Sequence, residues 1–162
     1  MKFELLDPRR HDREGFDCGV DALNTYLKRF ANQDIKRGLT RVYVLCDGRR
    51  IAGYFSLSAH SVSRQNLPPT IQAGPYEELP FLMLGRLAVD REYQGRGLGD
   101  VLIVHAFAIT RSAAGQIGIL GMIVDAKDEH AAGFYQRFGF QRLSSAALRL
   151  VLPITTMDRL LG

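Results

Sequence analysis

The stretch QGRGLG at residues 94–99 has the residue types and spacing of an anion-binding turn. It follows an apolar run at residues 82–90 and precedes a Leu-, Val- and Ala-rich run that is typical of a helix. The first N–H groups of a helix lack partners within the helix, so glycines there let a phosphate reach the backbone. Arg96 adds a permanent positive charge. The alternative is a tight turn that needs glycine only for its positive φ.

Other common binding patterns do not fit this chain. The stretch lacks the Gly-Lys-Ser/Thr ending of a P-loop, and it is not part of a dinucleotide-binding pattern with an acidic residue in a second strand. Cys18 and Cys46 are the only cysteines, and neither they nor the four histidines have the spacing of metal ligands. We therefore expect no metal site and two buried thiols.

Hydrophobic periodicity predicts a mixed chain with the element order β-α-β-β-β-α-β-α-β-β and no internal repeat. The expected strands are residues 2–6, 41–47, 49–63, 81–90, 117–126, 140–143 and 148–153. The expected helices are residues 20–30, 98–113 and 129–138, with a helical turn at residues 154–161. A parallel βαβ crossover around residues 81–126 would interrupt a mostly antiparallel central sheet with flanking helices. The fold class is thus α/β (α+β), in a single domain over residues 1–162.

Local signals mark several boundaries. The first helix has an apolar stripe at Val20, Leu23, Leu27 and Phe30. The second has one at Leu98, Leu102, His105 and Ile109. Gly38 is expected to end the first helix and Asp128 to cap the third, while Asp47-Gly48 predicts a hairpin turn.

Composition limits the classes of function. Residues 66–80 contain four prolines, which predicts a long loop. No run approaches the roughly 18 apolar residues of a membrane span, and the N-terminal residues lack the apolar core of a signal peptide. We therefore expect a cytoplasmic protein without a membrane partner. The net charge is +4, and 17 of the 21 basic residues are Arg, whose planar fork suits phosphate.

The segment LAVDREYQGRGLGDVLI resembles motif A of the GCN5-related N-acetyltransferases (the GNAT superfamily), and DEHAAGFYQRFGF resembles their motif B. The predicted element order is also similar to the GNAT order. The resemblance implies that backbone amides of residues 94–99 hold the pyrophosphate of acetyl-CoA. It also implies that residues 87–89 lie along the pantetheine arm, where a main-chain N–H polarises the thioester carbonyl. The implied cofactor-binding residues are Leu87, Ala88, Val89, Gln94, Gly95, Arg96, Gly97, Leu98 and Gly99.

Tyr135 matches the motif B position from which a phenol commonly protonates the leaving CoA thiolate. The alternative is a core aromatic, because Phe134 and Phe138 flank it. In a helix, however, Tyr135 lies about 100° from Phe134 and need not share its burial. We take Tyr135 as the expected catalytic residue.

Four further segments are similar to the GNAT toxins of bacterial type II toxin-antitoxin modules: FDCGVDALNTYLKRFANQ, GYFSLSAHSV, LGRLAVDREYQGRGLG and FYQRFGF. Those enzymes acetylate the free amino group of aminoacyl-tRNA and so block translation. The resemblance implies charged tRNA as substrate, a ribbon-helix-helix antitoxin as partner and a homodimer.

The expected fourth strand lacks a carboxylate that could act as a base on lysine. FLMLGRLAVD contains no Glu, and Asp90 lies at its far end beside the glycine-rich turn. An α-amino group has a pKa of about 7.7–8.0, against about 10.4 for lysine, so a useful neutral fraction exists without a strong base. The missing base is compatible with aminoacyl-tRNA, although Glu77, Glu78 or a chain of waters could also serve.

A tRNA substrate also needs contacts to its phosphates. The candidate residues are Lys28, Arg29, Lys36, Arg37, Arg41, Arg86 and Arg91. The alternative is a solvated basic helix face. Arg86 fits that alternative least, because an arginine inside an apolar strand needs a partner, a cleft or a phosphate.

Two other functions are compatible with the same motifs. One is a GNAT that acetylates a small-molecule amine or a protein N-terminus. The other is a module that binds acetyl-CoA without catalysis, for which Tyr135 would be dispensable.

Overall fold

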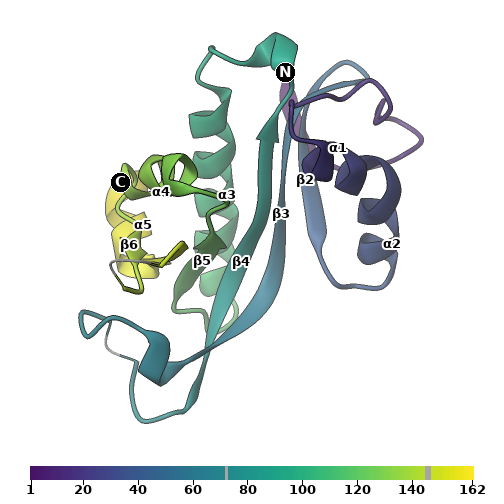
Figure 1. The fold of residues 1–162 in the computed structure, drawn as a ribbon. Helices are drawn as coiled ribbons and strands as arrows, with labels where there is room; N and C mark the ends of the chain where they lie inside the picture. Colours follow the sequence, from purple (N-terminus) through teal and green to yellow (C-terminus); the bar gives the residue numbers. More distant parts are fainter. Residues whose placement is uncertain (72, 145–146) are drawn as a thin grey trace. The chain divides into compact units, whose positions relative to one another are not determined.

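The computed structural model describes residues 1–71, 73–144 and 147–162. Within these residues, seven strands form one sheet in the order β1-β2-β3-β4-β5-β7-β6 (Figure 1). The strands are β1 (Lys2–Leu5), β2 (Arg41–Asp47), β3 (Arg50–Ser63), β4 (Glu78–Val89), β5 (Gly121–Asp125), β6 (Gln141–Arg142) and β7 (Arg149–Pro153). The α-helices are α1 (Asp21–Thr25), α2 (Ala31–Lys36), α3 (Leu98–Ala114), α4 (Glu129–Gln136) and α5 (Ile154–Leu161). The predicted fold class is confirmed, with β4 and β5 as the parallel pair.

The chain divides into two compact units, and each consists of two segments. The first comprises Met1–Ser58 and Gly85–Ala106, and the second comprises Ala59–Leu84 and Phe107–Gly162. Strands β3 and β4 and helix α3 therefore each contribute residues to both units.

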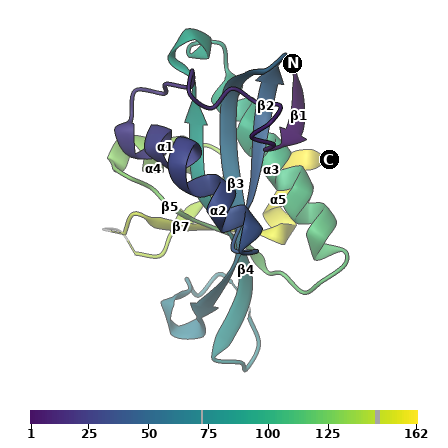
Figure 2. The same ribbon diagram turned by 90° about the vertical axis from the view of Figure 1, so that its right-hand side faces the viewer.

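The first unit is built on the antiparallel strands β1, β2 and the beginning of β3. Helices α1 and α2 cover one face of β2 and β3 (Figure 2). The core between them includes Phe16, Leu27 and Tyr54, each at most 1% exposed. Gly48 has a φ of 64° in the turn between β2 and β3, so the predicted hairpin turn is confirmed.

A π-helical segment, Tyr26–Phe30, joins α1 to α2 and changes which side chains are buried. Leu27 and Ala31 are fully buried, whereas Phe30 is 51% exposed. The predicted stripe placed Phe30 in the core, and this was wrong because a π-helical turn contains more residues than an α-helical one. Gly38 has a φ of 75° just after α2, as expected of the residue that ends a helix.

An aromatic cluster in the first unit encloses His105 of α3. The imidazole stacks on Phe3 with ring centroids 3.8 Å apart, and the rings of Tyr43 and Phe55 lie edge-on to it. Burial lowers the pKa of His105. The side chain is therefore part of the packing, as the predicted stripe on α3 required.

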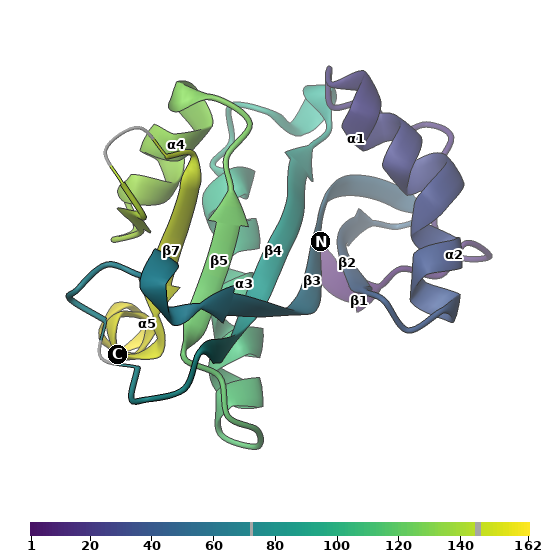
Figure 3. The same ribbon diagram turned by 60° about the horizontal axis from the view of Figure 1, so that its bottom comes forward.

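The second unit is built around β5, which is parallel to β4 and antiparallel to β7 (Figure 3). Phe81, Ile123 and Val151 form its core on these strands. A Cβ atom added to Gly121 would lie 2.2 Å from the carbonyl oxygen of Leu152, so no larger residue fits there. Asp128 accepts a hydrogen bond from the Ala131 N–H and caps α4, as predicted.

Two boundaries in the second unit differ from prediction. Strand β4 starts at Glu78, so residues 78–80 belong to a strand rather than to the expected loop. Proline lacks only the N–H donor and can occupy a strand where no ladder bond is needed. Strand β5 starts at Gly121 rather than at residue 117, and Ile117 is 62% exposed. A run of apolar residues therefore overestimated the strand's length.

We predict that Gly121→Ala lowers the free energy of unfolding by about 1–3 kcal/mol, because the methyl group overlaps a backbone atom that cannot rotate away. The matched control is Gly133→Ala on α4, where an added Cβ meets no described atom within 4 Å. That change should be neutral or stabilising by roughly 0.5–1 kcal/mol. Urea unfolding midpoints would measure both. Equal midpoints for the two variants would contradict the close approach at Gly121.

We also predict a pH dependence that originates at His105. Its pKa is lower in the folded protein, so the unfolded chain binds the proton more readily and stability falls as pH drops below about 6.5. His105→Phe keeps a ring on Phe3 but cannot be protonated. Between about pH 7 and pH 5, the free energy of unfolding of His105→Phe should fall less steeply than that of the wild type. The difference in slope should correspond to at most about one bound proton. Urea titrations at several pH values would measure this. If the free energy of unfolding changed with pH equally in both proteins, the prediction would be contradicted.

Candidate functional site

The glycine-rich turn has its backbone donors free. Gly95 and Gly97 have φ of 81° and 74°, and helix α3 begins directly afterwards at Leu98. Within the described ranges, the N–H groups of residues 95–97 form no hydrogen bond, and residues 94–97 are exposed. A Cβ at either glycine would meet no described atom within 4 Å, so the backbone is open to a ligand. Free N–H groups at the start of a 17-residue helix suit a pyrophosphate.

The buried carboxylate of Asp90 fixes the start of this turn. Asp90 is 3% exposed, and its Oδ2 and Oδ1 accept hydrogen bonds from the N–H groups of Asp17 (3.0 Å) and Glu92 (2.9 Å). The Asp90 N–H donates to the carbonyl of Ala52 on β3. Asp90 is therefore an anchor for the turn, and sequence reasoning had noted only its position.

Gln94 ties the turn to the N-terminal segment FDCG, residues 16–19. Its Nε2 donates to the carbonyl oxygens of Cys18 at 3.1 Å and Val89 at 2.9 Å. The Gln94 side chain therefore links the turn to two neighbouring segments, and its N–H donates to the Arg91 carbonyl at 3.4 Å, so the free N–H groups begin at Gly95.

Positive charge lies beside the turn in a fixed arrangement. The guanidinium groups of Arg50 and Arg96 lie 5.0 and 5.1 Å from the ring centroid of Tyr93. The Tyr93 hydroxyl donates to Asp47, and this bond raises the pKa of Tyr93. Arg96 also donates to the carbonyl of Glu92. Arg96, predicted from sequence, thus has a defined position, and Arg50, 44 positions before the turn in the sequence, lies beside the same ring and pairs with Glu92.

The strand residues predicted to follow the pantetheine arm lie next to the turn on β4. Ala88 is 5% exposed, and Leu87 and Val89 are half-buried. A Cβ added to Gly53 of β3 would lie 3.0 Å from both the Ala88 carbonyl oxygen and the Leu102 side chain. Close packing against β3 and α3 therefore fixes this part of β4. Leu98 and Gly99 begin α3 as predicted.

Tyr135, the predicted catalytic residue, belongs to the second unit. It is 8% exposed and packs edge-to-face against Phe134 and Phe140, with centroids 5.2 and 5.5 Å away. Burial raises its pKa to about 12, which keeps the phenol protonated at neutral pH. The hydroxyl forms no hydrogen bond with the described residues and is not sealed from solvent. It is therefore an available proton donor on a fixed ring.

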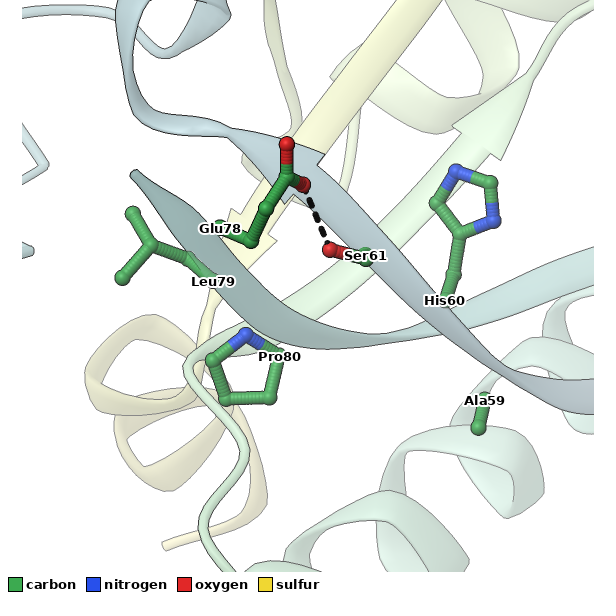
Figure 4. Close-up of a pocket in the computed structure, with 6 residues that line it drawn as sticks. All are labelled: Ala59, His60, Ser61, Glu78, Leu79 and Pro80. Carbon is green, nitrogen blue, oxygen red and sulfur yellow. Dashed lines mark hydrogen bonds between the residues drawn. The ribbon is translucent and has the colours of Figure 1, made fainter. Parts of the chain in front are cut away.

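Glu77 and Glu78, named from sequence as alternative bases, lie in the second unit, and Glu78 is on β4, so the expectation that this strand has no carboxylate was wrong. Glu78 accepts a 2.6 Å hydrogen bond from Ser61 at a shallow hollow of about 480 Å³, lined by residues 59–61 and 78–80 (Figure 4). Glu77 pairs with Arg64 at 3.5 Å.

The seven basic residues predicted to contact tRNA all lie in the first unit. Arg29, Lys36, Arg37 and Arg41 are exposed, and Lys28 is half-buried. Arg91 is exposed but pairs with Asp17 at 3.8 Å. Arg86 differs from these residues, because its guanidinium carbon lies only 3.3 Å from the ring centroid of Tyr26.

Folding also brings together Glu4, His11 and Cys46, which sequence spacing had not related. His11 Nε2 lies 2.9 Å from Glu4 Oε1 and 3.2 Å from Cys46 Sγ. The Asp7 N–H donates to His11 Nδ1, so the proton of a neutral imidazole lies on Nε2. Nε2 is then a donor to its neighbours and not a free metal ligand. We interpret this group as a buried hydrogen-bonded cluster.

Comparison with known proteins relates nearly the whole chain to acetyltransferases. Residues 38–142 match the family described as "Acetyltransferase (GNAT) domain". A "Probable toxin TacT" of Sinorhizobium fredii is 33% identical, covering 98% of this chain and 94% of that protein. A "tRNA-acetylating toxin" of Mycobacterium tuberculosis is 33% identical, covering 96% of each.

Solved structures agree with these matches. AtaT complexed with acetyl-methionyl-tRNAfMet has a TM-score of 0.91 and 32% identity over 99% of both chains. AtaTR bound with AcCoA has a TM-score of 0.87 and 34% identity over 99% of this chain and 98% of that one. A Tyr-to-Phe mutant of AtaT bound to the C-terminus of the antitoxin AtaR has a TM-score of 0.85 and 32% identity, over 98% of this chain and 96% of that one. Among the described residues, no helix is long and apolar enough to cross a membrane.

We predict that Gly97→Ala weakens acetyl-CoA binding about tenfold or more, because the residue loses its open approach and its positive φ. The matched control is Gly48→Ala, which has a φ of 64° and equally open surroundings among the described residues. Both changes should lower stability by roughly 1–2 kcal/mol. Titration calorimetry with acetyl-CoA would separate them. Unchanged affinity in Gly97→Ala would rule out the turn as the phosphate site.

Proposed function

This chain belongs to the GNAT acetyltransferase family, and from that premise we propose that it is a toxin that acetylates aminoacyl-tRNA with acetyl-CoA. The acceptor would be the α-amino group of the esterified amino acid, and acetylation would block its use in translation. The observation that carries the proposal is 33% identity over 96% of the chain to a tRNA-acetylating toxin.

The residues at the turn fit the cofactor. Acetyl-CoA supplies an acetyl group on a thioester together with a pyrophosphate that needs hydrogen-bond donors. The free N–H groups of residues 95–97 and the charge of Arg96 supply those donors. We place the pantetheine arm along residues 87–89, where a backbone N–H would stabilise the oxyanion that develops during transfer.

The amine attacks the thioester carbonyl, a C–N bond forms and the C–S bond breaks. Tyr135 would donate a proton to the leaving sulfur, and the nitrogen would lose one proton to water. A phenol with a pKa of about 12 is protonated throughout the physiological range, as this donor role requires. The low pKa of an α-amino group removes the need for a strong base.

The partners follow from the same proposal. The basic residues of the first unit would contact tRNA phosphates, and binding would weaken with salt. A ribbon-helix-helix antitoxin would bind the toxin, as AtaR binds AtaT. We further propose that residues 1–162 act as one acetyltransferase domain, that the protein is a homodimer and that it acts in the cytoplasm, where charged tRNA is used.

The test is transfer of labelled acetyl from acetyl-CoA to total charged tRNA, with deacylated tRNA and free amino acids as controls. Label in charged tRNA alone is expected. Label in free amines or peptides alone would overturn the tRNA substrate and favour the small-amine alternative.

We predict that Tyr135→Phe lowers kcat about 100-fold or more while acetyl-CoA affinity stays within about twofold, because only a proton donor is lost. Tyr43→Phe removes the same hydroxyl from a ring that stacks on Phe55, and it should leave kcat unchanged. Steady-state kinetics of both variants provide the measurement. Full turnover in Tyr135→Phe would overturn the assigned role.

A further inference from the structure

Arg86 carries a half-buried charge without an acidic partner. Within residues 1–71, 73–144 and 147–162, no carboxylate forms an ion pair or hydrogen bond with its guanidinium, whose carbon lies 3.3 Å from the centroid of the Tyr26 ring. By contrast, Arg50 pairs with Glu92 and Arg149 pairs with Asp125. Removing a charge from water is costly unless an anion compensates, and a cation–π contact compensates only in part.

Tyr26 is a rigid support for this guanidinium. It is 6% exposed, lies in the same core as Tyr54 and Ala88, and donates its hydroxyl proton to Asp34 at 3.0 Å. Burial raises its pKa to about 12, so the ring stays neutral. Tyr26 also begins the π-helical segment, and such segments frequently occur at functional sites.

The stack fixes the orientation of Arg86 and leaves its hydrogen-bond donors available. The guanidinium carbon lies over the ring, and within the described residues its N–H groups form no hydrogen bond, so they can bind an anion. This planar fork matches two oxygens of one phosphate group, and little side-chain entropy remains to be lost on binding. A lysine could supply the charge but not this geometry.

We propose that Arg86, held on Tyr26, is a binding site for one phosphate group at the acceptor end of the RNA substrate. The inference rests on the proposed function and adds the specific group recognised. The cofactor's pyrophosphate is assigned to residues 94–99, which follow Val89. Arg86 lies at the opposite end of segment 87–89, about 10 Å from Val89 along an extended strand. A phosphate at that end therefore comes from the acceptor and not from the cofactor.

The experiment compares two acceptors that carry the same amino acid: the charged tRNA that the wild type labels best, and aminoacyl-adenosine, which has no phosphate. The variants are Arg86→Gln and Arg86→Lys, and Arg111→Gln is the charge-matched control because Arg111 is exposed on α3. Acetyl-CoA affinity is measured for each. KM and kcat are determined separately for each acceptor. Their comparison distinguishes a loss of phosphate binding from general structural damage.

Arg86→Gln should raise the KM for charged tRNA about 10- to 100-fold while kinetics with aminoacyl-adenosine and acetyl-CoA affinity stay within about twofold. Arg86→Lys should recover only part of the loss, because it lacks the fork. Arg111→Gln should resemble the wild type with both acceptors.

Three results would overturn the proposal: equal losses with both acceptors, a loss of acetyl-CoA affinity alone, or no change. If the wild type acetylates neither acceptor, the proposed function fails, and binding of deacylated tRNA then tests Arg86 separately. In that case Arg86→Gln should weaken binding of the deacylated tRNA. It should also reduce the slope of log K against log salt concentration by about 0.7–0.9, which corresponds to the loss of one phosphate contact. An unchanged slope would overturn the Arg86 site itself.

Discussion

The hydrogen bonds to the buried carboxylate of Asp90 are the constraint on which the glycine-rich turn depends. This one side chain satisfies backbone N–H groups from two distant segments, residues 16–19 and the turn that follows β4. The Arg91 N–H donates back to the Asp17 carbonyl, and Gln94 donates to the Cys18 carbonyl. Removing the carboxylate would leave two part-buried N–H donors without their acceptor and would release both segments from each other. The N-terminal segment therefore supports the proposed cofactor site through Asp90 and through the side chain of Gln94.

The anchored turn shows how a proposed cofactor site can consist largely of backbone N–H groups. Side chains of Asp90, Gln94 and Tyr93 all bind protein atoms, so they fix the turn and leave its N–H groups free. A donor set that is held before the ligand arrives loses little entropy on binding. Tyr135 follows the same principle in the second unit, because two aromatic neighbours fix its ring and leave its hydroxyl available.

Much of this could be predicted from sequence, because it depends on local rules. The bounds of β2, the turn at Gly48 and the cap at Asp128 each depend on residues close together in the chain. The failures depend on distant contacts or on small departures from ideal geometry. An apolar pattern cannot distinguish an α-helix from one with a π-helical turn, so Phe30 was misplaced. The stack of Arg86 on Tyr26 joins residues 60 positions apart, and only the oddity of an arginine in an apolar strand indicated it.

The discontinuous make-up of the first unit has a consequence for biosynthesis. Asp17 emerges early from the ribosome. Asp90, which accepts a hydrogen bond from its N–H, belongs to the later segment Gly85–Ala106, which completes the same unit. Until that segment emerges, the FDCG loop has no acceptor for its N–H, and the turn it must hold has not been made. A nascent chain shorter than about two thirds of the full length thus lacks part of the first unit, which holds the proposed cofactor site. For a protein proposed to block translation, the order of synthesis itself withholds activity until most of the chain is complete.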